Sequence, residues 1–225
     1  MLYYYEDIRT VIEVVSAIMC FILVRFMIKP YKITGESRYI GLPVGFGFLG
    51  ITYIVSALAF YVPRIFGENT IYIQLIARTF SFIFISSTYF FSTKSTRNSK
   101  RLWKLTLIIL ITSVIISFLI VSLPVITLPS YIATRNFLRV LNLILILYIC
   151  SHTFKSHIQK PDPTTIWIPL GYAFLAVSQY SLLLFQLDNS LYAFFAGLVL
   201  RLVFLSVFLI VTFRAFYHTR KGEQI

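Results

Sequence analysis

Seven apolar runs of roughly 20 residues alternate with short polar segments along this chain. A helix of that length, rising about 1.5 Å per residue, crosses the roughly 30 Å hydrocarbon core of a bilayer. The pattern therefore predicts an all-α membrane protein. Its seven transmembrane helices cover about residues 7–28, 39–62, 70–92, 103–124, 131–153, 165–187 and 190–215.

Residues that break helices separate these runs. The predicted connections are Pro30–Gly35, Pro63–Gly67, Ser92–Ser99, Pro124–Pro129, Pro161–Pro163 and Asp188–Asn189. None of them is long enough for a separate soluble domain, so residues 1–225 are expected to form a single transmembrane domain.

The composition excludes a water-soluble protein. Hydrophobic residues make up 58% of the chain and charged residues only 12%, whereas soluble domains have about 45–50% apolar and about 25% charged residues. The net charge of +12 is explained by basic connections on one side of a membrane. Nucleic acid is therefore not expected as a partner.

The lysines predict the orientation of the chain. All of them lie in the first, third and fifth connections or in the C-terminal tail, at Lys29, Lys32, Lys94, Lys100, Lys104, Lys155, Lys160 and Lys221. The positive-inside rule places these segments in the cytoplasm and the N-terminus outside. We expect a multi-pass protein of the cell membrane that contacts the lipid bilayer.

An internal repeat relates the second and the sixth predicted helix. PVGFGFLGIT begins at Pro43 and PLGYAFLAVS begins at Pro169, an offset of 126 residues. The same offset relates Lys29 to Lys155, and ENTIY in the second connection has a counterpart in DNSLY in the sixth. Arg78 and Arg201 follow in the third and seventh helices. Shared membrane composition is the alternative explanation, and three matches in order favour duplication.

The repeat implies a plan of three helices, one linker helix and three helices. Its units cover about residues 7–92 and 131–215, with a linker helix at about 103–124. A single linker helix returns the chain to its starting side, so the two triplets point the same way, as parallel repeats do in some carriers.

Polar residues within the predicted helices share one layer, in the half of the membrane nearer the outside. A charged or polar group at such a depth indicates a functional site. The members are Glu13, Arg78, Arg139, Asn142, Gln179 and Arg201.

Two interpretations of this polar layer are open. The planar guanidinium group of arginine binds carboxylate or phosphate through paired hydrogen bonds. Three arginines with one acid therefore predict an anion-binding pocket. Alternatively, Glu13 pairs with one arginine while the others reach the headgroups, which is hard for Arg201 near the midplane. Hydroxyl groups of Tyr53, Ser56 and Tyr180 could add to the site, although each is expected to serve packing.

The residues that carry most enzyme chemistry are missing from the predicted helices. The histidines, at 152, 157 and 218, all lie near the cytoplasmic face, and no carboxylate cluster exists for a metal. No serine or cysteine follows a nucleophile-elbow pattern, and no glycine-rich phosphate loop occurs. We expect neither an enzyme nor a cofactor.

The layout resembles the microbial rhodopsins, which are seven-helix proteins with the N-terminus outside. Helix three of that family carries an arginine, an acid three residues later, an aromatic residue next and hydroxyl residues about one turn further on. Here Arg78, Ser81, Phe82 and Ser86 match these places, and the acid is absent. The family also needs a lysine in helix seven for retinal, where this chain has Arg201. The resemblance implies a relative without the chromophore.

The same helix plan is similar to that of the sugar carriers called SWEETs. Pro43 and Pro169 look like their helix prolines, whereas their prolines in helices one and five are missing here.

Three functions follow as expectations. The first is a receptor-like or sensory module that acts through a partner protein, because no effector domain is expected after the last helix. The second is a carrier of a small solute or anion, and the third is an accessory subunit of a larger membrane complex.

Overall fold

The computed structural model describes residues 2–34, 37–61, 68–92, 97–123, 130–159, 161, 163 and 165–217. Its helices are α1 (Leu2–Thr34), the short 3₁₀ helix η1 (Ser37–Ile40), α2 (Gly41–Tyr61), α3 (Glu68–Ser92), α4 (Arg97–Ser122), α5 (Tyr131–Gln159), α6 (Trp167–Asp188) and α7 (Leu191–Tyr217). The described residues contain no strand. Each of the seven α-helices is long and apolar enough to cross a membrane, so the chain is an all-α integral membrane protein.

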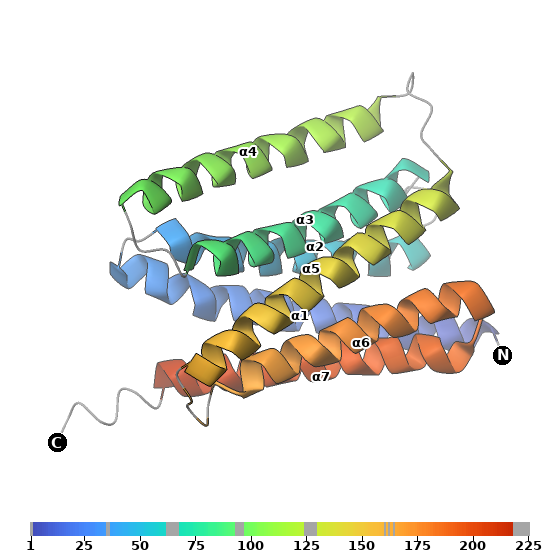
Figure 1. Cartoon of the computed structure of the whole chain (residues 1–225). Helices are drawn as coiled ribbons and strands as arrows, with labels where there is room; N and C mark the ends of the chain where they lie inside the picture. Colours follow the sequence, from blue (N-terminus) through green and yellow to red (C-terminus); the bar gives the residue numbers. More distant parts are fainter. Residues whose placement is uncertain are drawn as a thin grey trace.

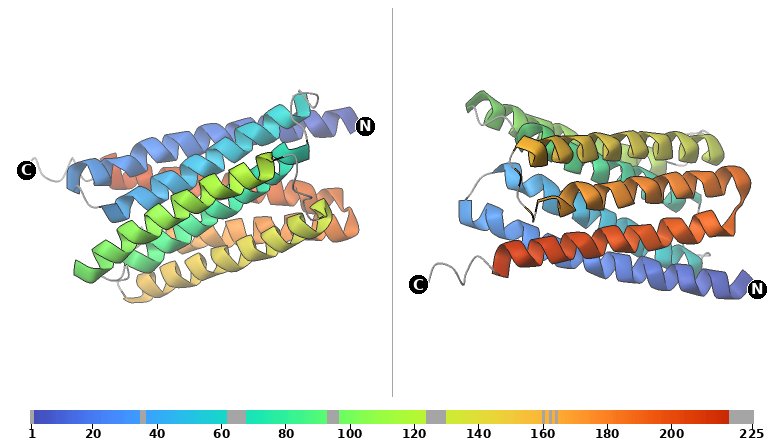
Figure 2. Two further views of the ribbon diagram at one scale, coloured as in Figure 1. Left: turned by 90° about the horizontal axis from the view of Figure 1, so that it is seen from above. Right: turned by 60° about the horizontal axis from the view of Figure 1, so that its bottom comes forward.

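Six of these helices form a ring. α1 packs against α2, α2 against α3, α3 against α5, α5 against α6, α6 against α7, and α7 back against α1. The helices run alongside one another with α4 at the top (Figure 1). The start of α1 and the end of α7 lie at opposite ends of the bundle in both views of Figure 2. α4 packs on α3 and η1, so it lies outside the ring and connects its two halves.

The first predicted connection is partly wrong, because α1 continues through Pro30 to Thr34. A proline removes one hydrogen bond of the helix, between its own missing N–H and the carbonyl four residues earlier. Near the end of a long helix the neighbouring bonds are enough to keep the chain helical. A short 3₁₀ helix, η1, then leads into α2 at Gly41.

Two other helices extend beyond their predicted limits. α4 begins at Arg97 rather than near residue 103, and α5 ends at Gln159 rather than near residue 153. Both extensions carry polar and basic side chains, which can reach water while the backbone stays helical. The predicted connections Pro63–Gly67 and Pro124–Pro129 and the C-terminal tail with Lys221 lie outside the described residues.

The predicted break at Asp188-Asn189 is confirmed. α6 ends at Asp188, and Asn189 adopts a left-handed conformation with φ 51° and ψ 26°. Asparagine tolerates this region better than most residues. The Asn189 N–H donates to the Phe185 carbonyl at 3.0 Å. The resulting tight turn fixes α6 and α7 as an antiparallel pair.

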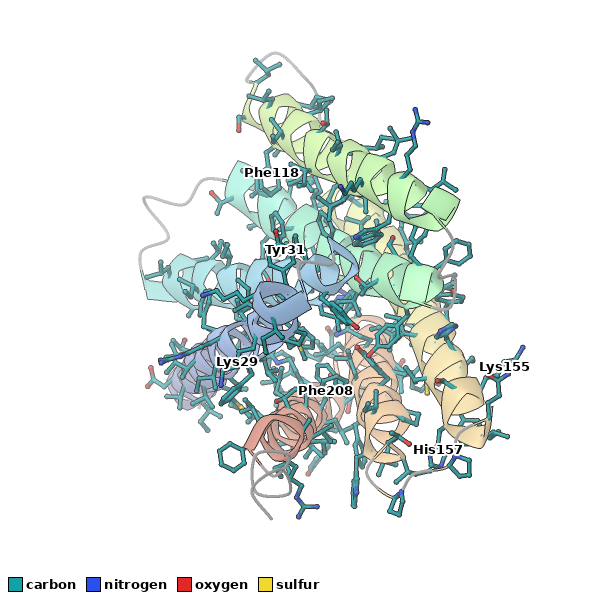
Figure 3. All side chains as sticks on the ribbon, turned by 90° about the vertical axis from the view of Figure 1, so that its left-hand side faces the viewer. Lys29, Tyr31, Phe118, Lys155, His157 and Phe208 are labelled. Carbon is teal, nitrogen blue, oxygen red and sulfur yellow. The ribbon has the colours of Figure 1, made fainter. Side chains whose placement is uncertain are left out.

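A group of buried aromatic side chains, which we call the aromatic wall, fills the ring towards the end at which α7 ends. We use this name for Phe46 of α2, Tyr172 of α6, and Phe204 and Phe208 of α7, all of them buried. Phe46 and Tyr172 each contact both phenylalanines of α7, with ring centroids 4.9–6.2 Å apart. Viewed along the bundle, Phe208 lies among the helices and Lys155 at the periphery (Figure 3).

The outer surface of the bundle is apolar. Among the exposed side chains on α4 are Leu105, Ile108, Ile109, Ile115 and Leu119. Lipid tails can cover such a surface without any loss, because they are as apolar as leucine. These side chains therefore contact the bilayer.

Burial in α2 and α6 matches at the offset of 126 residues. The α2 positions 43, 45, 46, 49, 50, 52, 53 and 56 are buried, and so are the α6 positions 169, 171, 172, 175, 176, 178, 179 and 182. The exposed positions Ile51 and Ile54 likewise correspond to Val177 and Tyr180. The two helices thus turn equivalent faces towards the inside of the ring.

Candidate functional site

A buried ion pair joins the first and the last helix of the ring. Arg201 Nη1 of α7 donates to Glu13 Oε1 of α1 at 3.2 Å, and the two side chains are only 2% and 3% exposed. This geometry agrees with the interpretation in which Glu13 pairs with one arginine, and Arg201 faces the interior. In a medium without water, each charge is stable only because the other is close.

The ring of Tyr53 lies against two arginines. The Arg201 guanidinium carbon is 4.3 Å from the centroid of the Tyr53 ring, and that of Arg78 is 5.5 Å from it. A cation over an aromatic face is attracted by about 2 kcal/mol when water is excluded. Tyr53 of α2 therefore positions both the α7 arginine and the α3 arginine, although sequence reasoning assigned it to packing.

Several polar atoms of this cluster have no hydrogen-bond partner. They are Arg201 Nε and Nη2, Glu13 Oε2, Arg78 Nε, Ser56 Oγ and Asn142 Oδ1. An unsatisfied polar group away from water is unfavourable by about 1–3 kcal/mol, and more when it is charged. These donors and acceptors are therefore buried without a partner among the described residues.

Arg139 is held by α6. Its Nη1 donates to the Leu182 carbonyl. With its amide in the orientation that satisfies its neighbours, Gln186 accepts from Arg139 Nη1 at 3.0 Å. The positive charges of Arg78 and Arg135 both act on Arg139. The α5 arginine thus faces the same interior as the α3 arginine.

The polar layer has members at similar depth on all six ring helices. Glu13, Arg78, Arg139 and Arg201 lie about 8–11 residues from the start of their helices, which is roughly 12–17 Å along the axis. Gln179 and Tyr53 lie about 8–9 residues, roughly 12–14 Å, before the ends of antiparallel helices. α4 contributes no member.

Not every predicted member contacts the ion pair. Asn142 and Gln179 are buried, but among the described residues neither amide bonds to Arg201. Tyr180 is 50% exposed, so its side chain lies on the outer surface of α6. Sequence reasoning missed Cys20, which is buried within the electrostatic range of both Arg201 and Glu13.

Sequence reasoning also missed Gln186, which contacts Arg139 and Arg135. It lies seven residues after Gln179, which places it two turns further along the same face of α6. This spacing was visible in the sequence, but an amide near the end of a helix carries no signal of its own.

The lysines whose side chains the structure describes lie outside the ring interior. Lys29 is half-buried, and Lys32, Lys104 and Lys155 are exposed. The buried cation of α7 is Arg201. A guanidinium cannot form the Schiff base that retinal needs. Comparison of the chain with protein-family models, with curated proteins and with solved structures finds no match.

Proposed function

We propose that this protein is a non-enzymatic, receptor-like membrane module that binds a small anion in the polar layer and acts through a partner protein. The observation that carries the proposal is the set of unpaired donors on Arg201 and Arg78. Arg201 is 2% exposed and uses one of its three nitrogens on Glu13. A small oxyanion would accept from the remaining donors.

The charge of the layer supports an anion rather than a cation. Three arginines, at 78, 139 and 201, face a single acid, Glu13. Guanidinium groups stay charged at any physiological pH, so the surplus cannot be removed by loss of a proton. An anion between them would lower the free energy of this charge cluster.

The aromatic wall favours a receptor over a carrier. Phe46, Tyr172, Phe204 and Phe208 close the ring on the side of the polar layer nearer the C-terminus. A ligand would therefore enter and leave from the N-terminal end, which the positive-inside rule places outside the cell. Binding at such a site changes the packing of helices that reach the opposite face.

A small-anion carrier is the second candidate. The matched burial of α2 and α6 fits two parallel three-helix repeats, a plan on which carriers are built. A carrier would have to open the aromatic wall during transport. Uptake of labelled acetate, phosphate or sulfate into vesicles containing the purified protein would favour the carrier, and binding without uptake would favour the receptor.

The anion site is tested on the purified protein in phosphatidylcholine nanodiscs. The fluorescence of Trp103 and Trp167 reports unfolding, and sodium acetate, phosphate or sulfate is added to a HEPES buffer without other salt. We expect at least one anion to raise the melting temperature in a saturable way, because a ligand that binds only the folded state stabilises it.

The test variants lie on α3, at Arg78, which supplies one of the unpaired donors. Arg78→Leu and Arg78→Gln should abolish the response, whereas replacement of the exposed Arg214 of α7 by leucine should leave it intact. A response that survives in both Arg78 variants would contradict the proposal, as would the absence of a response to all three anions. Crosslinking in native membranes followed by mass spectrometry would then identify the partner protein.

A further inference from the structure

With Tyr53 added and Asn142 left aside, the polar layer contains three pairs of corresponding positions. At the offset of 126 residues, Glu13 corresponds to Arg139 and Tyr53 to Gln179. In the third and seventh helices the offset is 123 residues and relates Arg78 to Arg201. One half of the layer is therefore Glu13, Tyr53 and Arg78, and the other half is Arg139, Gln179 and Arg201.

The helices that carry these residues bury the same faces. Ser16, Cys20, Leu23 and Met27 of α1 are buried, and so are their counterparts Asn142, Ile146, Ile149 and Thr153 of α5. In α3 and α7, at the offset of 123, Ser81, Phe82 and Ile85 are buried with Phe204, Leu205 and Phe208. These positions therefore correspond in burial. The charged residues differ, because Glu13 and Arg201 are buried whereas Arg139 and Arg78 are half-buried.

Close contacts at two glycines show the same correspondence. A Cβ on Gly45 of α2 would lie 2.6 Å from Ile85 of α3, and a Cβ on Gly171 of α6 would lie 2.9 Å from Phe208 of α7. The two glycines are 126 residues apart and their neighbours 123 residues apart. α2 thus approaches α3 at the place where α6 approaches α7.

The ring closes through two equivalent contacts, and their charges differ. Where α1 meets α7, Glu13 pairs with Arg201. Where α5 meets α3, the corresponding residues are Arg139 and Arg78, and the charge of Arg78 acts on Arg139. One contact has an acid and a base, whereas the other has two bases.

We infer that a small carboxylate ligand binds between Arg78 and Arg139, in the place corresponding to that of the Glu13 carboxylate against Arg201. This inference rests on the proposed function and names the position and the chemical class of the anion. Arg78 Nε is buried and has no partner to donate to. A planar carboxylate accepts two parallel N–H bonds from an arginine, as a side-chain carboxylate does.

The inference makes a specific prediction for Arg139→Glu. The new side chain would supply the carboxylate from the chain itself and pair with Arg78. In HEPES buffer without other salt, the melting temperature in phosphatidylcholine nanodiscs should rise by about 2–4 °C, the shift that 1 kcal/mol produces in a protein of this size. Added sodium acetate should raise the melting temperature of the wild-type protein and should have no effect on this variant.

Two control variants separate the new ion pair from the loss of a positive charge. Arg139→Gln should lose the response to acetate without the full gain in melting temperature, and Arg135→Gln, one turn away on α5, should keep the response. The double variant Arg78→Gln with Arg139→Glu should lose the gain, because the coupling of two residues in contact appears only when both are present.

The outcomes distinguish this inference from the proposed function. A wild-type response to phosphate or sulfate but not to acetate would contradict a carboxylate ligand and would still support the anion site. The absence of any anion response would overturn both. A gain in Arg139→Glu that persists without Arg78, or an acetate response that survives in Arg139→Glu, would overturn the position between the two arginines.

Discussion

Glu13 and Arg201 are separated by 188 positions in the chain and form a buried ion pair 3.2 Å long. The pair joins α1 to α7, so it lies at one of the two contacts through which the six-helix ring closes. It also lies at the depth of the polar layer. A single interaction therefore contributes both to the assembly of the fold and to the electrostatics of the candidate site.

Glu13→Leu should destabilise the protein more than Arg201→Leu does. A guanidinium left behind stays charged, whereas a carboxyl group left behind can take up a proton and become neutral. Losing one partner of a buried pair destabilises by about 3–5 kcal/mol, and we expect the arginine variant to fall below that range. Thermal unfolding in nanodiscs measures both. An equal or larger effect of Arg201→Leu would show that the arginine is not part of a charge surplus.

Tyr53→Phe should be tolerated better than Tyr53→Leu. A phenylalanine keeps an aromatic face for Arg201 and Arg78, whereas leucine removes it. The difference between the variants should be about 1–2 kcal/mol of stability. If both variants unfold at the same temperature, the contact of the ring with the arginines contributes nothing.

Gly45→Ala should destabilise the contact between α2 and α3, and Gly47→Ala is its matched control. A Cβ on Gly45 would lie 2.6 Å from Ile85 and 3.0 Å from the Ser81 carbonyl, while one on Gly47 would lie 3.9 Å from its nearest neighbour. Overpacking of this kind destabilises by about 1–3 kcal/mol. The melting temperature of the control should stay at or above that of the wild type, and a fall in both variants would point to the helix backbone instead.

Labelling of single cysteines tests the orientation. In a background without Cys20 and Cys150, Tyr192→Cys at the start of α7 should react with a membrane-impermeant maleimide on intact cells. Lys155→Cys, near the end of α5, should react only after the membrane is opened. The reverse pattern would invert the orientation that the lysines predict.

Incubation with all-trans retinal should give no red-shifted pigment that hydroxylamine bleaches. Such a pigment requires an amine inside the bundle, and the described lysines are exposed or, for Lys29, half-buried. Absorption spectra of the purified protein provide the measurement. Introducing Arg201→Lys is the informative companion variant, since it places an amine next to Tyr53.

The number and the type of helices could be predicted from the sequence because crossing a bilayer requires long apolar runs. The Glu13–Arg201 pair could also be anticipated, since Glu13 was the one acid at the depth of Arg201. The helix ends were harder. Pro30 marks the end of a helix in most contexts, and the last turn of α1 continues past it because one missing bond near a terminus is tolerated.

The role of Tyr53 could not be predicted, because aromatic residues make up 17% of the chain and most of them pack against lipid or against one another. The sequence also did not show which of the other arginines lie near the ion pair. Arg78 and Arg139 lie at similar depths, and only the packing of α3 on α5 brings their charges together. Such contacts depend on how each helix is rotated about its own axis. A helix that is apolar on all sides gives no sequence signal of that rotation.

The long separation between Glu13 and Arg201 has a consequence for the synthesis of the protein. At about 5–20 residues per second, a ribosome adds Arg201 roughly 10–40 seconds after Glu13. During that time α1 resides in the membrane with an acid that has no permanent counter-charge. Glu13 can spend this time as a neutral acid, an option closed to an arginine at the same position. The order of the two residues along the chain therefore lets the acid be inserted first and the ring be closed by the last helix to arrive.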